Sequence, residues 1–231
     1  MTNLGSGVFY LCSSLAHINV VSGNTTFASL DGVLFSKDQS TLIRLPSKNP
    51  ATTYVIPDTV TTIGDYAFDE CYNLTDIQFG KNVTTTGKYA FSDCTGLTTI
   101  SVPATVTSLG YGAFSGCAGL VSATIPGSVG SIGSYTFSKC KNLKNVTLGS
   151  GITTIGNRAF QECTSLRSIV IPDGTTLIGT YAFYKCTRLK LVVVPRGLSK
   201  FDNNAFYDCT ALNHILKFLS RTSHSIMIIP L

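Results

Sequence analysis

The sequence predicts a solenoid of stacked coils, in which every coil adds one short parallel β-strand to a common sheet. Phenylalanine returns with a period of 23 residues, and a cysteine follows each phenylalanine after three places. Each unit also contains an L-x-x-I-x-I run, whose alternating apolar residues are typical of a strand with one buried face. The phenylalanines of this period are Phe68, Phe91, Phe114, Phe137, Phe160, Phe183 and Phe206.

A period of roughly 20 to 29 residues built on such a run is typical of leucine-rich repeats, whose units stack along one axis. We therefore expect a leucine-rich-repeat solenoid. Its short parallel strands line a concave face, and single helical or 3-10 turns and loops form the convex face. Because each unit contacts only its neighbours, the length of the chain sets the number of coils rather than the number of domains.

The period divides the chain into four parts, which differ in how closely they follow the repeat. They are a partial repeat at 1–21, an inserted segment at 22–50, tandem repeats at 51–212 and a tail at 213–231. Within the insertion, two β-prone runs separated by a polar segment predict a hairpin. The array begins in the middle of a repeat, so the sequence leaves open whether the chain is a fragment of a longer protein.

Within each coil, the residue types predict where the chain turns. A proline or glycine column, which includes Pro103 and Pro126, ends the strand where the missing N–H of proline costs no ladder hydrogen bond. The V-x-x-I-G segment that follows returns apolar side chains to the core, and its glycine permits a positive φ or a close approach between coils. Ala67 and Phe68, like their equivalents, are expected to form a single helical or 3-10 turn.

The tail departs from the repeat after the last leucine of the column. Leu212, Ile215, Leu216 and Leu219 have the spacing of one face of a helix. The core edge of a terminal coil is exposed unless something covers it. We therefore expect the tail to form a short helix that caps the last coil.

The eight cysteines are predicted to be free and buried. Seven share one column, and Cys12 follows Phe9 by the same three residues, which places all eight in equivalent inward positions. Neighbouring coils lie about 4.8 Å apart along a parallel sheet, whereas the β-carbons of a disulfide lie about 3.8 Å apart in a specific torsion. Stacked cysteines are therefore poorly placed for pairing, and they act as small hydrophobic residues.

The sequence contains no constellation that indicates an enzyme. His17, His214 and His224 lack metal-ligand spacing, and there is no C-x-x-C pair, phosphate-binding loop or G-x-S-x-G motif. We expect no catalytic activity, no metal and no cofactor. The chain has no basic and apolar leader and no apolar run of about 18 residues, so neither a secretory signal nor a transmembrane segment is expected.

The recurring I-P-x-x-V-T-x-I-G-x-x-A-F-x-x-C-x-x-L pattern resembles the BspA-type (Treponema pallidum-type) leucine-rich repeat. The resemblance covers nearly the whole chain, and the DGVLF segment at 31–35 resembles a feature of the same family. It implies a cell-surface or secreted protein of the kind found in bacteria and parasitic protists, which adheres to host proteins or to other cells. Without a signal peptide, a cytoplasmic location is the alternative.

Two groups of residues are candidate binding sites. Flanking positions of the last strands become apolar and predict a concave patch of Val170, Leu191 and Val193. Lys144, Arg167 and Lys190 each follow the repeat leucine, so they form a basic ladder at strand spacing. The alternatives are simple β-propensity for the patch and long solvated side chains for the ladder.

Charge is unevenly distributed and favours an acidic partner for the C-terminal half. Residues 1–138 have a net charge of −3, and residues 139–231 have a net charge of +8. The first hypothesis is an adhesin-like interaction module that binds a protein or an acidic glycan through its concave sheet. The second is an intracellular scaffold that uses the same sheet. Nucleic acid is an unlikely partner because no stacking aromatic residue accompanies the ladder, and the sequence leaves the oligomeric state open.

Overall fold

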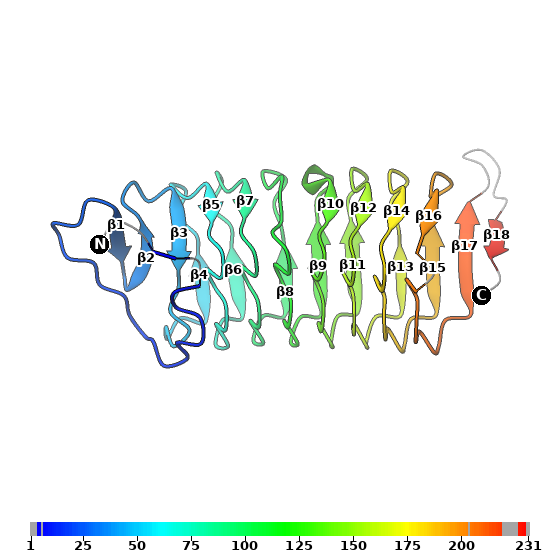
Figure 1. Cartoon of the computed structure of the whole chain (residues 1–231), viewed down its shortest axis with the longest axis horizontal. Helices are drawn as coiled ribbons and strands as arrows, with labels where there is room; N and C mark the ends of the chain where they lie inside the picture. Colours follow the sequence, from blue (N-terminus) through cyan, green and yellow to red (C-terminus); the bar gives the residue numbers. More distant parts are fainter. Residues whose placement is uncertain (1–3, 6, 203, 219–225, 230–231) are drawn as a thin grey trace.

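The computed structural model describes residues 4–5, 7–202, 204–218 and 226–229. The chain forms coils that follow one another along a single axis, with the N-terminus and the C-terminus at opposite ends (Figure 1). Each coil has two layers: a main strand runs along one side of the core, and the chain returns along the other side. We call the outer surface of the main strands the strand face and the opposite surface the turn face.

Eight main strands lie in parallel along the described part of the strand face, and each pair of neighbours for which a register is given is offset by 23 residues. This arrangement confirms the predicted solenoid. The strands are β4 (Thr53–Val55), β6 (Asp76–Gln78), β8 (Thr99–Ser101), β9 (Ser122–Ile125), β11 (Asn145–Leu148), β13 (Ser168–Val170), β15 (Leu191–Val194) and β17 (His214–Phe218).

A second set of two-residue strands lies in the returning layer, where the sequence pattern predicts only inward-facing apolar residues. They pair in parallel from coil to coil because the threonine and isoleucine columns are extended at this point. The strands are β5 (Thr62–Ile63), β7 (Thr85–Thr86), β10 (Ser131–Ile132), β12 (Thr154–Ile155), β14 (Leu177–Ile178) and β16 (Lys200–Phe201). A single 3-10 turn, η1 (Gly127–Val129), precedes β10.

The Ala-Phe segment forms successive turns instead of the predicted helical or 3-10 turn. Tyr66 and Glu70 adopt φ values of 57° and 60°, which interrupt a right-handed helix. As a result, backbone N–H groups alternate between two directions: Phe68 donates to Ala90 of the next coil, and Asp69 donates to Tyr66 within its own turn. This alternation lets the turns form hydrogen bonds along the solenoid as a sheet does.

The insertion forms a three-stranded antiparallel unit that joins the array. The hairpin predicted within it is present as β2 (Val33–Ser36) and β3 (Thr41–Arg44), and β1 (Phe27–Leu30) adds an outer strand. β3 then pairs in parallel with β5, so Thr41 lies beside Thr62. The insertion therefore covers the exposed edge of the first regular coil.

The tail corrects the predicted helix. Its first part is the strand β17, which pairs in parallel with β15 in the 23-residue register of the array, and β18 (Ile226–Ile229) pairs with β17 antiparallel. The unpaired backbone groups at the edge of β15 favour an added strand over an isolated helix. Leu219, the last residue of the predicted helix, lies outside the described residues.

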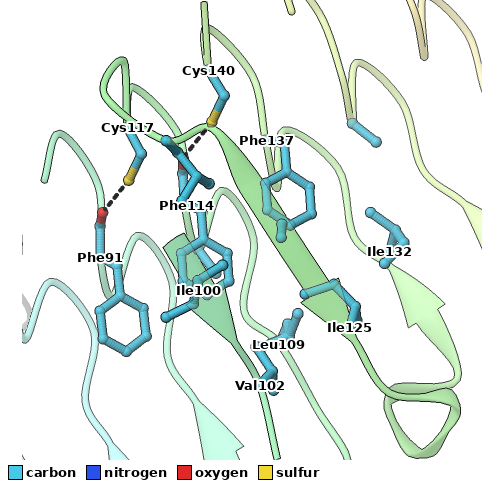
Figure 2. Close-up of a cluster of buried hydrophobic side chains, with 14 of the residues drawn as sticks. Phe91, Ile100, Val102, Leu109, Phe114, Cys117, Ile125, Ile132, Phe137 and Cys140 are labelled. Atoms are coloured by element: carbon cyan, nitrogen blue, oxygen red, sulfur yellow. Dashed lines mark hydrogen bonds between the residues drawn. The ribbon is translucent and has the colours of Figure 1, made fainter. Parts of the chain in front are cut away.

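The core is a stack of phenylalanine rings that runs the length of the array. Neighbouring rings from Phe68 to Phe206 lie 5.0 to 5.5 Å apart between centroids and are nearly parallel. Figure 2 shows part of this stack, with Phe114 and Phe137 packed against isoleucines of the opposite layer. Fully burying a phenylalanine contributes about 1.5–3 kcal/mol, so this column supplies much of the stabilisation.

The cysteine column is free and buried at seven positions, as the sequence predicts. Cys12 is the exception, because it is exposed. It lies in the partial repeat before the insertion, and its place in the repeat pattern does not bring its side chain into the core.

Candidate functional site

The strand face brings the three residues of the predicted patch together. Val170 lies directly beside Val193 in the parallel register of β13 and β15, and Ser168 lies beside Leu191. Leu191 and Val193 share one face of β15 because they are two residues apart. Val170 is 62% exposed, whereas the two β15 side chains are half-buried. Val170 is thus the most exposed side chain of the patch.

The structure extends this patch by one residue that the sequence prediction misses. Leu216 of β17 lies beside Val193, and it is half-buried. Its position 23 residues after Val193 is the signal that identifies it, and the assignment of the tail to a helix conceals that signal. We define Val170, Leu191, Val193 and Leu216 as the apolar row.

The basic ladder lies where the last main strands begin, and its three side chains are exposed. The N–H of Lys190 donates to the carbonyl of Arg167 over 2.8 Å, which shows that these two residues are direct neighbours. Together with Arg188, Thr187 and Ala211 they line a hollow of about 260 Å³. Lys144 does not line it, so the structure brings together only two of the three predicted ladder residues at this hollow.

The cations of the hollow have no carboxylate partner within the described residues. Ion pairs in that part of the chain join Lys81 to Asp58 over 3.1 Å and Lys200 to Asp202 over 3.3 Å. Arg167, Arg188 and Lys190 therefore present their charges to solvent. Since like charges at strand spacing repel each other, an anionic partner would stabilise this arrangement.

The apolar row and the basic hollow draw on neighbouring segments of the same two coils. Arg167 directly precedes β13, which begins at Ser168, and Lys190 directly precedes β15, which begins at Leu191. The combination of an accessible apolar strip and unpaired cations is suited to reversible binding of a surface that has both apolar and acidic groups.

The described residues contain neither a cluster suited to a metal ion nor a membrane-spanning helix. No group of three or more His, Cys, Asp or Glu side chains is arranged to hold a metal ion. None of the helical segments has the length and apolar character needed to cross a bilayer.

A protein-family comparison accounts for most of the chain. The model of the BspA type leucine rich repeat region matches in six copies over residues 47–134 and 108–223. The chain belongs to this family. The assignment confirms the resemblance noted in the repeat pattern. No match was found among curated proteins.

Solved structures of bacterial leucine-rich repeat proteins are similar to this chain. One from Eubacterium ventriosum has a TM-score of 0.88 and 28% identity, and it matches 96% of this chain and 60% of its own length. One from Bacteroides ovatus has a TM-score of 0.65 and 26% identity over 93% of this chain and 58% of its own. The Treponema pallidum leucine-rich repeat protein has a TM-score of 0.52 and 22% identity over 86% of this chain and 81% of its own, which supports the fold alone.

The chain spans about 60% of the length of the Eubacterium and Bacteroides proteins. Its repeat array is a protein-interaction type of fold, in which a rigid scaffold presents an extended surface. These relationships give the class of the protein, and the partner must be inferred from the surface itself.

Proposed function

We propose that the C-terminal half of the strand face binds an acidic region of a protein partner. The observation that supports this most directly is that unpaired cations of the basic hollow directly precede β13 and β15, the strands that carry most of the apolar row. Apolar side chains on the same surface favour a protein partner, because burial of apolar area contributes to protein association while cations steer the acidic partner.

The electrostatic part of this binding depends on salt. The charges of Arg167, Arg188 and Lys190 are exposed, so they are screened over about 8–10 Å at ionic strengths of 0.1–0.15 M. Binding should weaken as salt rises and persist in part because the apolar row is insensitive to screening. A binding site that consisted of charge alone would lose nearly all of its affinity.

The setting that the family resemblance supports is the cell surface, where the chain would act as an adhesin-like module. The alternative is an intracellular scaffold that uses the same face. Fractionation of the source cells followed by detection with an antibody separates the two. Recovery from the cell envelope or the medium supports the adhesin-like role, and recovery only from the cytosol supports the scaffold.

The binding test uses immobilised poly-L-glutamate as an acidic polypeptide. The variant Lys144→Gln/Arg167→Gln/Lys190→Gln should elute at clearly lower salt than the parent. A matched control, Lys37→Gln/Lys48→Gln/Lys88→Gln, removes three exposed lysines of the N-terminal half and therefore the same net charge. If both triple variants elute at the same salt concentration, retention depends only on net charge, and a binding site at the basic ladder is contradicted.

The apolar row is tested separately with Leu191→Asp. This change should reduce retention further than charge alone explains, because it places a carboxylate beside the basic hollow and removes apolar area. Thr99→Asp is the matched control, since Thr99 occupies the same strand position four coils earlier and is exposed. If Leu191→Asp and Thr99→Asp elute together, the apolar row is not part of the site.

A further inference from the structure

The turn face contains a row of tyrosines that the proposed function does not use. One column of the repeat contains Tyr66, Tyr89, Tyr135 and Tyr181. Gly112 occupies this column in the coil between Tyr89 and Tyr135, and the preceding residue, Tyr111, supplies an aromatic ring there. The ring centroids of Tyr66 and Tyr89 are 5.4 Å apart, those of Tyr89 and Tyr111 are 5.3 Å apart, and those of Tyr111 and Tyr135 are 5.1 Å apart. We call these residues the tyrosine row.

Arg158 takes the tyrosine position in the coil between Tyr135 and Tyr181. Its guanidinium carbon lies 5.6 Å from the centroid of Tyr135 and 5.4 Å from that of Tyr181, within the range of cation–π interactions. Its Nη1 also donates to the hydroxyl of Tyr135 over 2.9 Å. The arginine is thus held in place by two rings and a hydrogen bond, although it is exposed.

The charge of Arg158 has no carboxylate partner within 4.0 Å in the residues that the structure describes. A second cation lies further along the same face, because Nζ of Lys185 is 5.1 Å from the ring centroid of Tyr184. The acidic residue nearest in sequence to Arg158, Glu162, shares its repeat column with Lys139 and Lys185. This part of the turn face therefore favours an anionic ligand.

A groove of about 480 Å³ lies at Arg158 and has an unusual lining. It consists of aromatic rings, hydroxyl groups, one amide and the guanidinium, and it contains no aliphatic side chain. The lining residues are Tyr111, Ser134, Tyr135, Asn157, Arg158, Thr180 and Tyr181. Asn157 accepts a hydrogen bond from the N–H of Thr180 through Oδ1, which leaves its amide nitrogen as a donor for a ligand.

This lining distinguishes between ligand classes. An amphipathic helix or an apolar peptide side chain would need aliphatic contacts, which the groove lacks. A proline-rich peptide inserts its rings between separated aromatic side chains, whereas the centroids of Tyr111 and Tyr135 are 5.1 Å apart and Arg158 fills the space between Tyr135 and Tyr181. A sugar has C–H groups that pack on the outer surface of the tyrosine row without entering between the rings, and its hydroxyl groups pair with amide and hydroxyl groups.

We propose that the groove between Tyr111 and Tyr181 binds an acidic oligosaccharide. Arg158 pairs with the carboxylate of one sugar, and the outer edges and hydroxyl groups of Tyr111 and Tyr181 contact that sugar and its neighbour. Because this site lies on the turn face, it is independent of the acidic partner proposed for the strand face. A linear acidic glycan would extend along the tyrosine row in the direction of the solenoid axis.

The experiment titrates the whole chain with oligogalacturonate and follows tyrosine fluorescence and heat, since the chain contains 10 tyrosines and no tryptophan. Arg158→Gln should weaken binding about tenfold or more, because it removes a charged hydrogen bond. Lys37→Gln, which removes one exposed charge of the insertion far along the chain from both proposed sites, should leave the affinity unchanged. The neutral counterpart, a galacto-oligosaccharide of equal length, should bind more weakly than the acidic one.

A second variant separates sugar recognition from charge attraction. Tyr111→Leu keeps an apolar side chain but removes a ring of the groove that does not hold Arg158, and it should also weaken oligogalacturonate binding. Absence of binding by the parent, or equal affinity of the parent and Arg158→Gln, would overturn the proposal. So would an unchanged affinity of Tyr111→Leu together with equal binding of a glutamate peptide, because charge alone would then explain the result.

Discussion

The thiol of Cys117 donates a hydrogen bond to the backbone carbonyl of Phe91, with Sγ and O 3.0 Å apart (Figure 2). The same bond recurs in other coils, at 3.0 to 3.2 Å, from Cys94, Cys140, Cys163, Cys186 and Cys209. A thiol is small, weakly polar and easily desolvated, so it fills this inward position while it satisfies a buried carbonyl oxygen. The cysteine column is thus explained by packing and hydrogen bonding without disulfides.

The first prediction concerns thiol labelling. Burial raises the pKa of the Cys71 thiol to about 12, and the other column cysteines are buried as well. Since the thiolate is the reactive form, these thiols should react slowly with a thiol reagent in the native protein, and Cys209, whose pKa is lowered by its contact with Cys186, should react before the rest of the column. Cys12 is exposed and should react first.

Cys12→Ser is the control and should abolish the fast phase. After denaturation, the parent should titrate close to eight thiols, the number in the sequence. A count near zero, or a fast phase that survives Cys12→Ser, would show that the column is paired or accessible.

The second prediction concerns backbone strain at Lys139. This residue has a φ of 62°, and Gly116 in the same repeat column has a φ of 74°. A left-handed conformation costs a non-glycine residue about 1–2 kcal/mol. Lys139→Gly should therefore raise the free energy of unfolding by about 0.5–1 kcal/mol after the greater entropy of glycine in the unfolded chain is counted.

Lys139→Ala is the matched control for Lys139→Gly. It removes the charged side chain but keeps the strain, so it should leave stability nearly unchanged. Urea unfolding measures both variants. If alanine stabilises as much as glycine does, the gain comes from the charge and not from the backbone.

The third prediction is a pH dependence at Asp69. Burial raises the pKa of this carboxyl to about 6, although the charge of Arg44 opposes the rise and the charges of Glu70 and Asp93 add to it. The folded state therefore binds a proton more tightly than the unfolded state, whose carboxyl has a pKa near about 3.9. The stabilisation that Asp69 contributes is complete when the pH is below the pKa of the unfolded state. It is lost as the pH rises through the folded-state pKa of about 6.

Asp69→Asn should consequently raise the melting temperature at pH 7.5 and have little effect near pH 4. Asp173→Asn, a change at an exposed carboxyl, is the control and should have no pH-dependent effect. The measurement is thermal unfolding of the three proteins at both pH values. An equal rise in melting temperature at both pH values would show that the titration of Asp69 is not the cause.

The fourth prediction compares two positions in the phenylalanine stack. Phe114 is fully buried between Phe91 and Phe137, whereas Phe206 lies in the last regular coil and is half-buried. Phe114→Ala should cost about 3–5 kcal/mol, because it leaves a cavity that the neighbouring coils cannot fill. Phe206→Ala should cost less, and equal losses in urea unfolding would contradict an end effect in the array.

Much of the fold could be predicted from the sequence because the repeat reports on local packing. The phenylalanine and cysteine columns each specify the same inward position in successive coils, so the period alone fixes the stacking direction. The tail is different, because the spacing of Leu212, Ile215 and Leu216 suits one face of a helix as well as an irregular strand. Only the open edge of β15 decides in favour of the strand β17.

The binding surfaces were less accessible to sequence reasoning. Lys144, Arg167 and Lys190 form a column, but the hollow at its end also requires Arg188 and Ala211 from adjacent turns. In the same way, Tyr111 lies one residue outside the tyrosine column and still joins the tyrosine row in space. Contacts between loops depend on side-chain direction and on turn geometry, which a periodic pattern does not specify.

The sequence by itself determined the class of the protein, the number of residues per coil and the inward columns, because burial of apolar side chains requires identical positions in every repeat. Tertiary structure alone decided the positive φ values at Tyr66 and Glu70, the strand in the tail and the exposure of Cys12. The φ values and the tail strand depend on hydrogen bonds to a neighbouring coil, and the exposure of Cys12 depends on how the chain packs around the partial repeat. Such bonds form only when the coils are stacked, so they leave no separate signal in the order of the residues.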